Sequence, residues 1–179
     1  MMPDVRQKNS IVYTIGHSNH PLRTFIELLT THRIEVVVDT RSFPYSRYAP
    51  HFRRSSLRLA LRESGLRYLY LGNELGGMPT DRQFYDPDGR VDYGALARWP
   101  PFQDAITRVE TGIERYRVAL LCSEENPAGC HRRLLIGRVL TQRSVAVWHI
   151  RGDGSVENDE TQEEHPWRST RSASRKREP

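Results

Sequence analysis

Two cysteines and a histidine are the residues whose types and spacing are best suited to chemistry. Cys122 is followed, after seven intervening residues, by Cys130 and His131. A thiolate is a nucleophile and a metal ligand, and an imidazole can transfer a proton or bind a metal. Cys130 would lie in the first turn of a helix predicted over residues 130–141, where the helix dipole and Arg132 favour its thiolate. We expect Cys130 to be a nucleophile or a redox-active thiol, and a buried structural cysteine is the alternative.

The same residues suggest a metal site as a second hypothesis. Cys122, Cys130 and His131 could supply thiolate and imidazole ligands, with His17 or His149 arriving from neighbouring strand ends. The spacing, however, lacks the short ligand intervals of structural zinc sites, and adjacent Cys and His residues rarely bind one ion. The primary expectation is therefore that no metal is bound, and the sequence leaves the identity of any cofactor unknown.

Acidic residues follow three of the predicted strands and are candidate acids or bases. We expect Asp39 and Glu124 to be catalytic and Glu74 to contact the substrate. If these carboxylates converge, their repulsion would raise the pKa of at least one of them toward neutrality, as general acid–base catalysis requires. Arg41 and Arg132 could hold a phosphate or carboxylate of the substrate. The alternative is that Asp39 pairs with Arg41 and Glu124 with Arg132.

Two glycine-containing segments are candidate binding loops. Gly16-His17-Ser18 follows a predicted strand and precedes a helix, so its backbone amides could bind an anion, and His17 could act in catalysis. This segment is neither a dinucleotide-binding fingerprint nor a P-loop. Gly76 and Gly77 could supply unusual backbone angles beside a ligand, or could form a plain turn.

Arginine and aromatic residues are interleaved over residues 41–62, and no acidic residue occurs there before Glu63. Arginine for phosphate and rings for base stacking are typical of a nucleotide or nucleic-acid surface. The alternative is a solvated basic loop whose rings cover the core. The arginines are Arg41, Arg47, Arg53, Arg54, Arg58 and Arg62, and the rings are Phe43, Tyr45, Tyr48 and Phe52.

Alternating strands and helices must position these residues. The pattern predicts an α/β fold with an open, doubly wound, Rossmann-like sheet of about five mostly parallel strands and helices on both faces. In such sheets ligands bind at the carboxyl ends of the strands, which the candidate residues follow. The predicted strands are 11–15, 34–38, 66–71, 117–122 and 145–150, the helices are 22–31, 56–63, 102–116 and 130–141, and residues 71–101 are predicted to be a loop.

Composition limits the class of protein. The chain has 179 residues and a formal net charge of +5, and only Lys8 and Lys176 among its 27 basic residues are lysine. The two cysteines cannot build a disulfide framework, and neither a membrane-spanning run nor a signal-peptide core is visible, so we expect a cytoplasmic protein without a membrane partner. We expect an extension over residues 1–10, one domain over residues 11–154 and a disordered charged tail over residues 155–179.

Five segments resemble the DUF488 family. They are Tyr13-Thr-Ile-Gly-His-Ser-Asn19, Val38-Asp-Thr-Arg41 with Pro44, Leu71-Gly-Asn-Glu-Leu-Gly-Gly77, Leu121-Cys-Ser-Glu124 with Cys130-His-Arg132, and the closing His149-Ile-Arg-Gly-Asp-Gly154. The resemblance covers roughly residues 11–154. It implies an α/β fold and a shared polar site but no reaction, because the function of the family is unknown.

We therefore expect an enzyme that acts on an anionic substrate, a nucleotide or a nucleic-acid base, at the carboxyl edge of the sheet. One alternative is a nucleic-acid-binding accessory protein without catalysis, which would use residues 41–62 and the basic end of the tail. The other is a metal- or redox-responsive protein built on Cys122, Cys130 and His131. The sequence indicates no oligomeric state.

Overall fold

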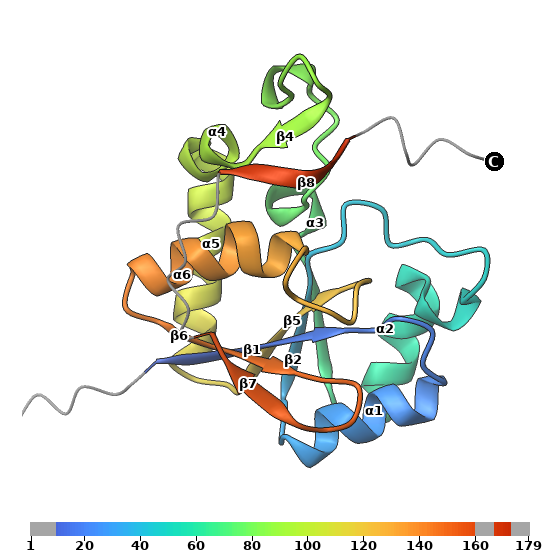
Figure 1. Ribbon diagram of the computed structural model, residues 1–179. Helices are drawn as coiled ribbons and strands as arrows, with labels where there is room; N and C mark the ends of the chain where they lie inside the picture. Colours follow the sequence, from blue (N-terminus) through green and yellow to red (C-terminus); the bar gives the residue numbers. More distant parts are fainter. Residues whose placement is uncertain (1–9, 160–166, 173–179) are drawn as a thin grey trace, which may run out of the picture.

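A six-stranded sheet forms the centre of the protein, whose computed structural model describes residues 10–159 and 167–172 (Figure 1). The strand order is β3-β2-β5-β1-β6-β7, and every neighbouring pair is parallel except β6 and β7. The predicted parallel α/β sheet is confirmed, with six strands in place of about five. The strands are β1 (Ile11–Gly16), β2 (Val36–Asp39), β3 (Arg67–Tyr70), β5 (Val118–Cys122), β6 (Ala146–Ile150) and β7 (Val156–Asn158).

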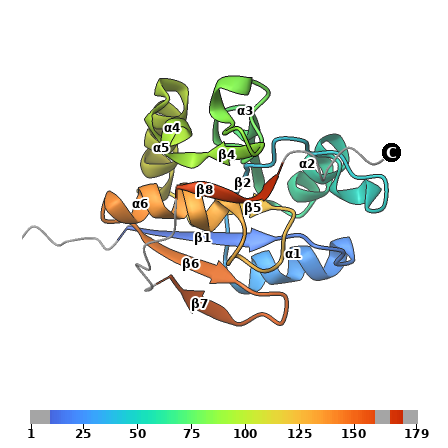
Figure 2. The same cartoon turned by 45° about the horizontal axis from the view of Figure 1, so that its top comes forward.

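Helices cover both faces of the sheet: Figure 2 shows α5 and α6 above β1, and Figure 1 shows α1 below β1. Successive strand residues point to opposite faces, so Val37 faces one hydrophobic cluster and Val38 the other. Each fully buried aliphatic side chain contributes about 1.5–3 kcal/mol to this packing. One face carries α1 (Leu22–Thr31), the 3-10 turn η1 (Pro50–Phe52) and α2 (Arg54–Glu63), and the other carries α5 (Pro100–Ile113), the π-helical turn η3 (Arg132–Gly137) and α6 (Arg138–Gln142).

The region predicted to be one long loop, residues 71–101, is folded, and that prediction is wrong. Its elements are too short to show a hydrophobic period, but Phe84 and Leu96 are buried in the core. The Asp92 carboxylate accepts a hydrogen bond from the Ala95 amide (3.0 Å) and caps a helix, as aspartate commonly does. The elements are α3 (Gly72–Leu75), η2 (Arg82–Phe84), β4 (Arg90–Asp92) and α4 (Tyr93–Arg98).

Two segments of the predicted tail are strands. β7 pairs antiparallel with β6, and Gly154 (φ +87°) allows the tight turn between them. β8 (Arg168–Ser172) pairs antiparallel with β4 to form a separate two-stranded sheet. Disorder over residues 155–179 is therefore wrong for these two segments, while residues 1–9, 160–166 and 173–179 lie outside the described residues. The division into domains stays a prediction.

Among the described residues, no helix is both long and apolar enough to cross a membrane. The loops that follow β1, β2, β3 and β5 carry the candidate residues to one end of the sheet.

Candidate functional site

The backbone amides predicted to bind an anion are already occupied. The His17 amide donates to the Cys122 carbonyl (3.0 Å), and the Ser18 amide donates to the Ser123 carbonyl (2.9 Å). These bonds continue the pairing of β1 with β5 beyond the strand ends. The prediction of an anion cradle at Gly16, His17 and Ser18 is therefore wrong, because the neighbouring strand takes up these two donors.

Gly16 allows the loop after β5 to approach β1 closely. A Cβ atom at Gly16 would lie 1.8 Å from the Glu124 carbonyl oxygen and 2.5 Å from the Arg132 guanidinium. Neither atom can move cheaply, because the first is backbone and the second belongs to a buried side chain. The absence of a side chain at Gly16 thus lets the loop after β5 lie directly on β1.

Gly76 and Gly77 likewise allow close packing of the loop after β3. Neither has a positive φ, so the prediction of unusual backbone angles is wrong. A Cβ atom at Gly77 would lie 2.6 Å from the His131 Cβ, and one at Gly76 would lie 2.2 Å from the Ser42 Oγ. These glycines let the loop after β3 pack against the imidazole of His131 and against the loop after β2.

Asp39 and Arg41 form a buried ion pair. The Arg41 Nε and NH2 groups donate to the two Asp39 carboxylate oxygens (2.8 and 2.7 Å), and Tyr68 donates its hydroxyl to the same carboxylate (2.6 Å). Arg41 NH1 also donates to the Phe52 carbonyl (2.8 Å). Asp39 is 0% and Arg41 4% exposed, so the geometry favours the alternative reading, a structural pair that joins β2, β3 and η1.

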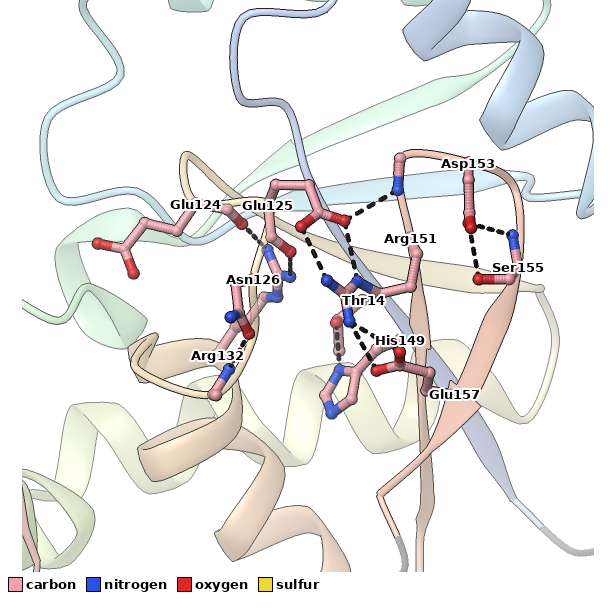
Figure 3. A network of polar contacts seen from close by, with 12 residues as sticks. Thr14, Glu124, Glu125, Asn126, Arg132, His149, Arg151, Asp153, Ser155 and Glu157 are labelled. Carbon is pink, nitrogen blue, oxygen red and sulfur yellow. Dashed lines mark hydrogen bonds and ion pairs between the residues drawn. The ribbon is translucent and has the colours of Figure 1, made fainter.

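Arg132 also points inward. Its side chain is fully buried and donates from NH1 to the Glu124 carbonyl and from NH2 to the Glu125 carbonyl (2.5 Å). Among the described residues, the Arg132 Nε has no partner. The predicted pairing of Arg132 with the Glu124 carboxylate is wrong, since Figure 3 shows that carboxylate extending away from the guanidinium. Arg132 binds the main chain of the loop after β5.

A second arginine holds this loop from the outside. The Glu125 carboxylate accepts from Arg151 Nε and NH2 (both 2.9 Å) and from the Gly152 amide (3.0 Å), as Figure 3 shows. The Arg151 hydrogen bonds, helped by that of Gly152, lower the pKa of Glu125 to about 2. Neither Glu125 nor Arg151 was a candidate, although the sequence places both beside candidate motifs. The loop is therefore fixed from both sides.

The three candidate carboxylates do not form a shared site. Asp39 is held by Arg41, Glu74 lies on α3, and Glu124 is half-buried in the loop after β5. Within residues 10–159 and 167–172, the group of titratable side chains whose ligand atoms come together consists of Cys122, Cys130 and His131.

This sulfur–imidazole cluster forms because the chain after β5 folds back on the strand end. The Cys130 Sγ donates to the Cys122 Sγ, 3.0 Å away, and the His131 Nδ1 lies 3.6 Å from the Cys122 Sγ and 3.8 Å from the Cys130 Sγ. All three side chains are buried, at 9% exposure or less. Two thiols and one imidazole nitrogen therefore face one point below the loops.

The loop after β2 orients the His131 ring. Its Nε2 lies 3.1 Å from the Thr40 carbonyl oxygen and 3.3 Å from the Thr40 hydroxyl, which itself donates to the Leu121 carbonyl (2.9 Å). A carbonyl can only accept, so Nε2 carries the proton and the lone pair of Nδ1 points to the sulfurs. Thr40 was not a candidate, although its place directly after β2 was a usable signal.

The thiolate character lies on Cys122, not on Cys130 as predicted. The pKa of Cys122 is lowered, first because its sulfur accepts the hydrogen bond from Cys130 and then because of nearby His131. Burial and the same hydrogen bond to Cys122 raise the pKa of Cys130. The charge of Arg132 acts in the expected direction and lowers the pKa of Cys130, but burial outweighs it.

The other two candidate histidines lie outside the cluster. His17 stacks on Phe52 with ring centroids 4.3 Å apart and donates from Nδ1 to the Ser18 carbonyl (2.7 Å). Burial, followed by the charge of Arg41, lowers the pKa of His17 to about 4. His149 is paired with the Thr14 hydroxyl (2.7 Å). The expectation that either would join Cys122 and Cys130 as a ligand is wrong.

The arginine- and ring-rich segment divides by exposure. Arg41 and Phe52 are buried, whereas Phe43, Tyr45 and Tyr48 are 60%, 67% and 93% exposed. We call the outward-facing part the arginine–aromatic surface. It consists of Phe43, Tyr45, Arg47, Tyr48, Arg53, Arg54, Arg58 and Arg62, of which Arg53 is half-buried and the others are exposed.

A protein-family comparison assigns the chain. The model of the domain of unknown function DUF488 matches residues 21–139, more than half of the chain. The chain belongs to the DUF488 family. The matched range of this DUF488 protein includes the sulfur–imidazole cluster and the arginine–aromatic surface but not Gly16 or His17. No curated protein and no solved structure matches the chain.

Proposed function

We propose that this DUF488 protein binds single-stranded nucleic acid through the arginine–aromatic surface. The observation that carries the proposal is the exposure of three large rings, Phe43, Tyr45 and Tyr48, beside exposed arginines in a segment without an acidic residue. Clustered exposed rings lose hydrophobic stabilisation that a folded chain normally keeps, so such patches mark binding sites. Bases stack on exposed rings at about 1–3 kcal/mol each, whatever their sequence.

The arginines lie where a phosphate backbone would run beside stacked bases. Arg53 places its guanidinium 4.5 Å from the centroid of the Tyr45 ring, so one charge already lies against one stacking platform. The Arg54 amide donates to the Pro44 carbonyl (3.0 Å), which joins the loop to the start of α2. Rings and guanidinium groups thus belong to one continuous surface.

The length of this surface favours a polymer over a free nucleotide. Arg54, Arg58 and Arg62 are exposed at four-residue intervals along α2, so they lie on one side of the helix. At 1.5 Å per residue they span about 12 Å, which is more than a single phosphate group can contact. Three rings together with this row of charges fit several linked nucleotides.

Binding without catalysis is the form of the proposal that the geometry supports. Asp39, Arg41 and Arg132, which were expected to act on or hold the substrate, are buried and engaged with other parts of the chain. By contrast, no arginine of the arginine–aromatic surface forms an ion pair with a carboxylate among the described residues.

The test is fluorescence anisotropy with labelled oligonucleotides of about 20 nucleotides, single-stranded DNA and RNA as well as duplex DNA. We expect the single strands to bind more tightly than the duplex, because only unpaired bases can stack on the rings. Affinity should fall steeply as salt rises, since phosphate contacts release counterions. No binding of either single strand at about 50 mM salt would refute the proposal.

Tyr116 provides a matched control. It is 36% exposed and lies under the Arg67 guanidinium (4.4 Å), but Arg67 begins β3 and so lies at the opposite, amino end of the sheet. The double variant Phe43→Ala/Tyr48→Ala should lose at least about tenfold in affinity, because two stacking platforms are removed. Tyr116→Ala should bind like the unmodified protein. Equal losses in the two variants would contradict the proposed surface.

A further inference from the structure

The sulfur–imidazole cluster has the dimensions of a metal site. With Zn–S bonds of about 2.3 Å and a Zn–N bond of about 2.0–2.1 Å, tetrahedral angles put sulfur about 3.5 Å from nitrogen and the two sulfurs about 3.8 Å apart. The His131 Nδ1 lies 3.6 Å from the Cys122 Sγ and 3.8 Å from the Cys130 Sγ. The sulfurs are 3.0 Å apart, so they need to separate by less than about 1 Å when a metal replaces the shared proton.

From this arrangement we infer that Cys122, Cys130 and His131 bind one zinc ion, Zn²⁺, below the loops of the carboxyl edge. Two sulfurs and one imidazole nitrogen are soft or borderline ligands that select zinc over magnesium or calcium. The group whose ligand atoms converge includes no carboxylate within the described part of the chain, which also disfavours these hard cations. Three protein ligands leave the fourth position of a tetrahedral ion for a water or another small ligand.

The surroundings of the ligands support this assignment. The Thr40 carbonyl, 3.1 Å from His131 Nε2, holds the imidazole with its free Nδ1 toward the sulfurs, and metal-bound histidines are commonly oriented in this way.

Charge balance also favours a divalent ion. Two thiolates and one neutral imidazole carry a charge of −2, which a Zn²⁺ ion cancels. A neutral complex can be buried at far less cost than two isolated thiolates, and the three ligand side chains are almost fully covered. The glycine at position 77 adds a steric argument, because a Cβ there would displace the His131 ring. The inference is independent of the proposed nucleic-acid binding.

The experiment is a titration of the reduced, metal-free full-length protein with Co²⁺, followed by Zn²⁺. Cobalt in a tetrahedral site with thiolate ligands gives sulfur-to-cobalt charge-transfer and visible d–d absorption bands. We expect both sets of bands to saturate at one equivalent and to disappear when Zn²⁺ displaces the cobalt. Zn²⁺ should also raise the thermal midpoint of unfolding, since an ion that binds only the folded state stabilises it.

Variants distinguish the proposed ligands from other histidines of the same sheet end. Cys122→Ser, Cys130→Ser and His131→Gln should each lose the charge-transfer band or weaken Co²⁺ binding at least about tenfold. His149→Gln serves as the control and should still bind one equivalent of Co²⁺, because His149 is paired with Thr14. A ligand variant is used only if circular dichroism shows that it folds. If it does not fold, the test is made on the unmodified protein, in which bound metal should protect both thiols against alkylation.

Three outcomes would overturn the inference. The first is the absence of saturable Co²⁺ binding when thiol titration shows both cysteines reduced. The second is unchanged binding in Cys122→Ser and His131→Gln together. The third is a rapid, preferred Cys122–Cys130 disulfide that forms in the presence of equimolar Zn²⁺, since a bound metal would protect both sulfurs.

Discussion

Arg41 and Arg58 belong to the same arginine-rich segment but lie in opposite environments. Arg41 is 4% exposed and shares two hydrogen bonds with the buried Asp39 carboxylate. Arg58 is exposed on α2, in a segment that contains no acidic residue before Glu63. A guanidinium at a buried site must be paired within the chain, whereas an exposed one can exchange water for a partner's phosphate. The same residue type therefore stabilises the fold in one place and is available to a binding partner in the other.

The comparison extends to the aromatic residues. Phe52 is fully buried and contacts the rings of His17 and Phe25, while Tyr48, four residues earlier, is 93% exposed. The division follows the geometry of the chain, because η1 turns Phe52 into the core beside α1 and α2 and leaves the preceding loop outside. Substitutions of the buried residues should therefore lower stability, and substitutions of the exposed residues should weaken binding.

The largest effect is expected for Arg41→Met. The variant leaves the Asp39 carboxylate buried without its cation, and such a loss costs about 3–5 kcal/mol. Urea unfolding should show this loss of the free energy of unfolding. The double variant Asp39→Asn/Arg41→Met should recover part of it, because no charge remains unpaired. A loss of less than about 1 kcal/mol in Arg41→Met would show that Arg41, like the exposed arginines, contributes little to the stability of the fold.

The next effect concerns the buried His17, whose pKa of about 4 lies below its ordinary value of 6.5. Between these values the unfolded chain binds the proton and the folded protein does not, so stability falls as the pH drops from about 6.5 to about 4. The shift corresponds to about 3 kcal/mol at full protonation of the unfolded state. His17→Asn should be less sensitive to pH over this window in urea unfolding. Equal pH profiles for the two proteins would contradict the shift.

A smaller loss of stability is expected for Gly77→Ala. The new Cβ would lie 2.6 Å from the His131 Cβ, and such overpacking costs about 1–3 kcal/mol. Since the imidazole must move, Co²⁺ binding should weaken as well. Gly112→Ala is the matched control, because its nearest neighbour would be 3.8 Å away and alanine favours helices. Similar behaviour of the two variants in unfolding and Co²⁺ titration would show that Gly77 does not position His131.

Hydrophobic pattern made the sheet, its flanking helices and the position of the site predictable. The run from Ile34 to Val38, apolar apart from Glu35, indicated a buried parallel strand because side chains on both faces of such a strand are apolar. β2 begins within this run at Val36 and ends one residue beyond it at Asp39. β8 could not be found in the same way, since its polar residues gain order by pairing with β4, a partner distant in the sequence. Non-local pairing of this kind leaves no periodic signal.

The candidate site was predictable as a location but not in its division of roles. The motifs named Cys122, Cys130 and His131 as one possible group, and the structure brings their ligand atoms together. Whether Arg132 faces a ligand or a carbonyl depends on a few ångströms of loop path, and Gly16 sets that path by allowing the loop after β5 to approach. The residue type alone does not show whether the Arg132 side chain points toward a ligand or toward a main-chain carbonyl.

The smallest effect on stability is expected for Arg58→Gln, and it completes the contrast with Arg41. Arg58 is exposed, and its replacement should change the free energy of unfolding by no more than about 0.5 kcal/mol. Binding of single-stranded oligonucleotides should nevertheless weaken at every sequence tested, and the slope of log affinity against log salt should decrease by about 1, because one phosphate contact is lost. Arg108→Gln, exposed on α5, should leave the slope unchanged. A stable Arg58→Gln protein with an unaltered salt slope would remove α2 from the arginine–aromatic surface and confine binding to the rings of the preceding loop.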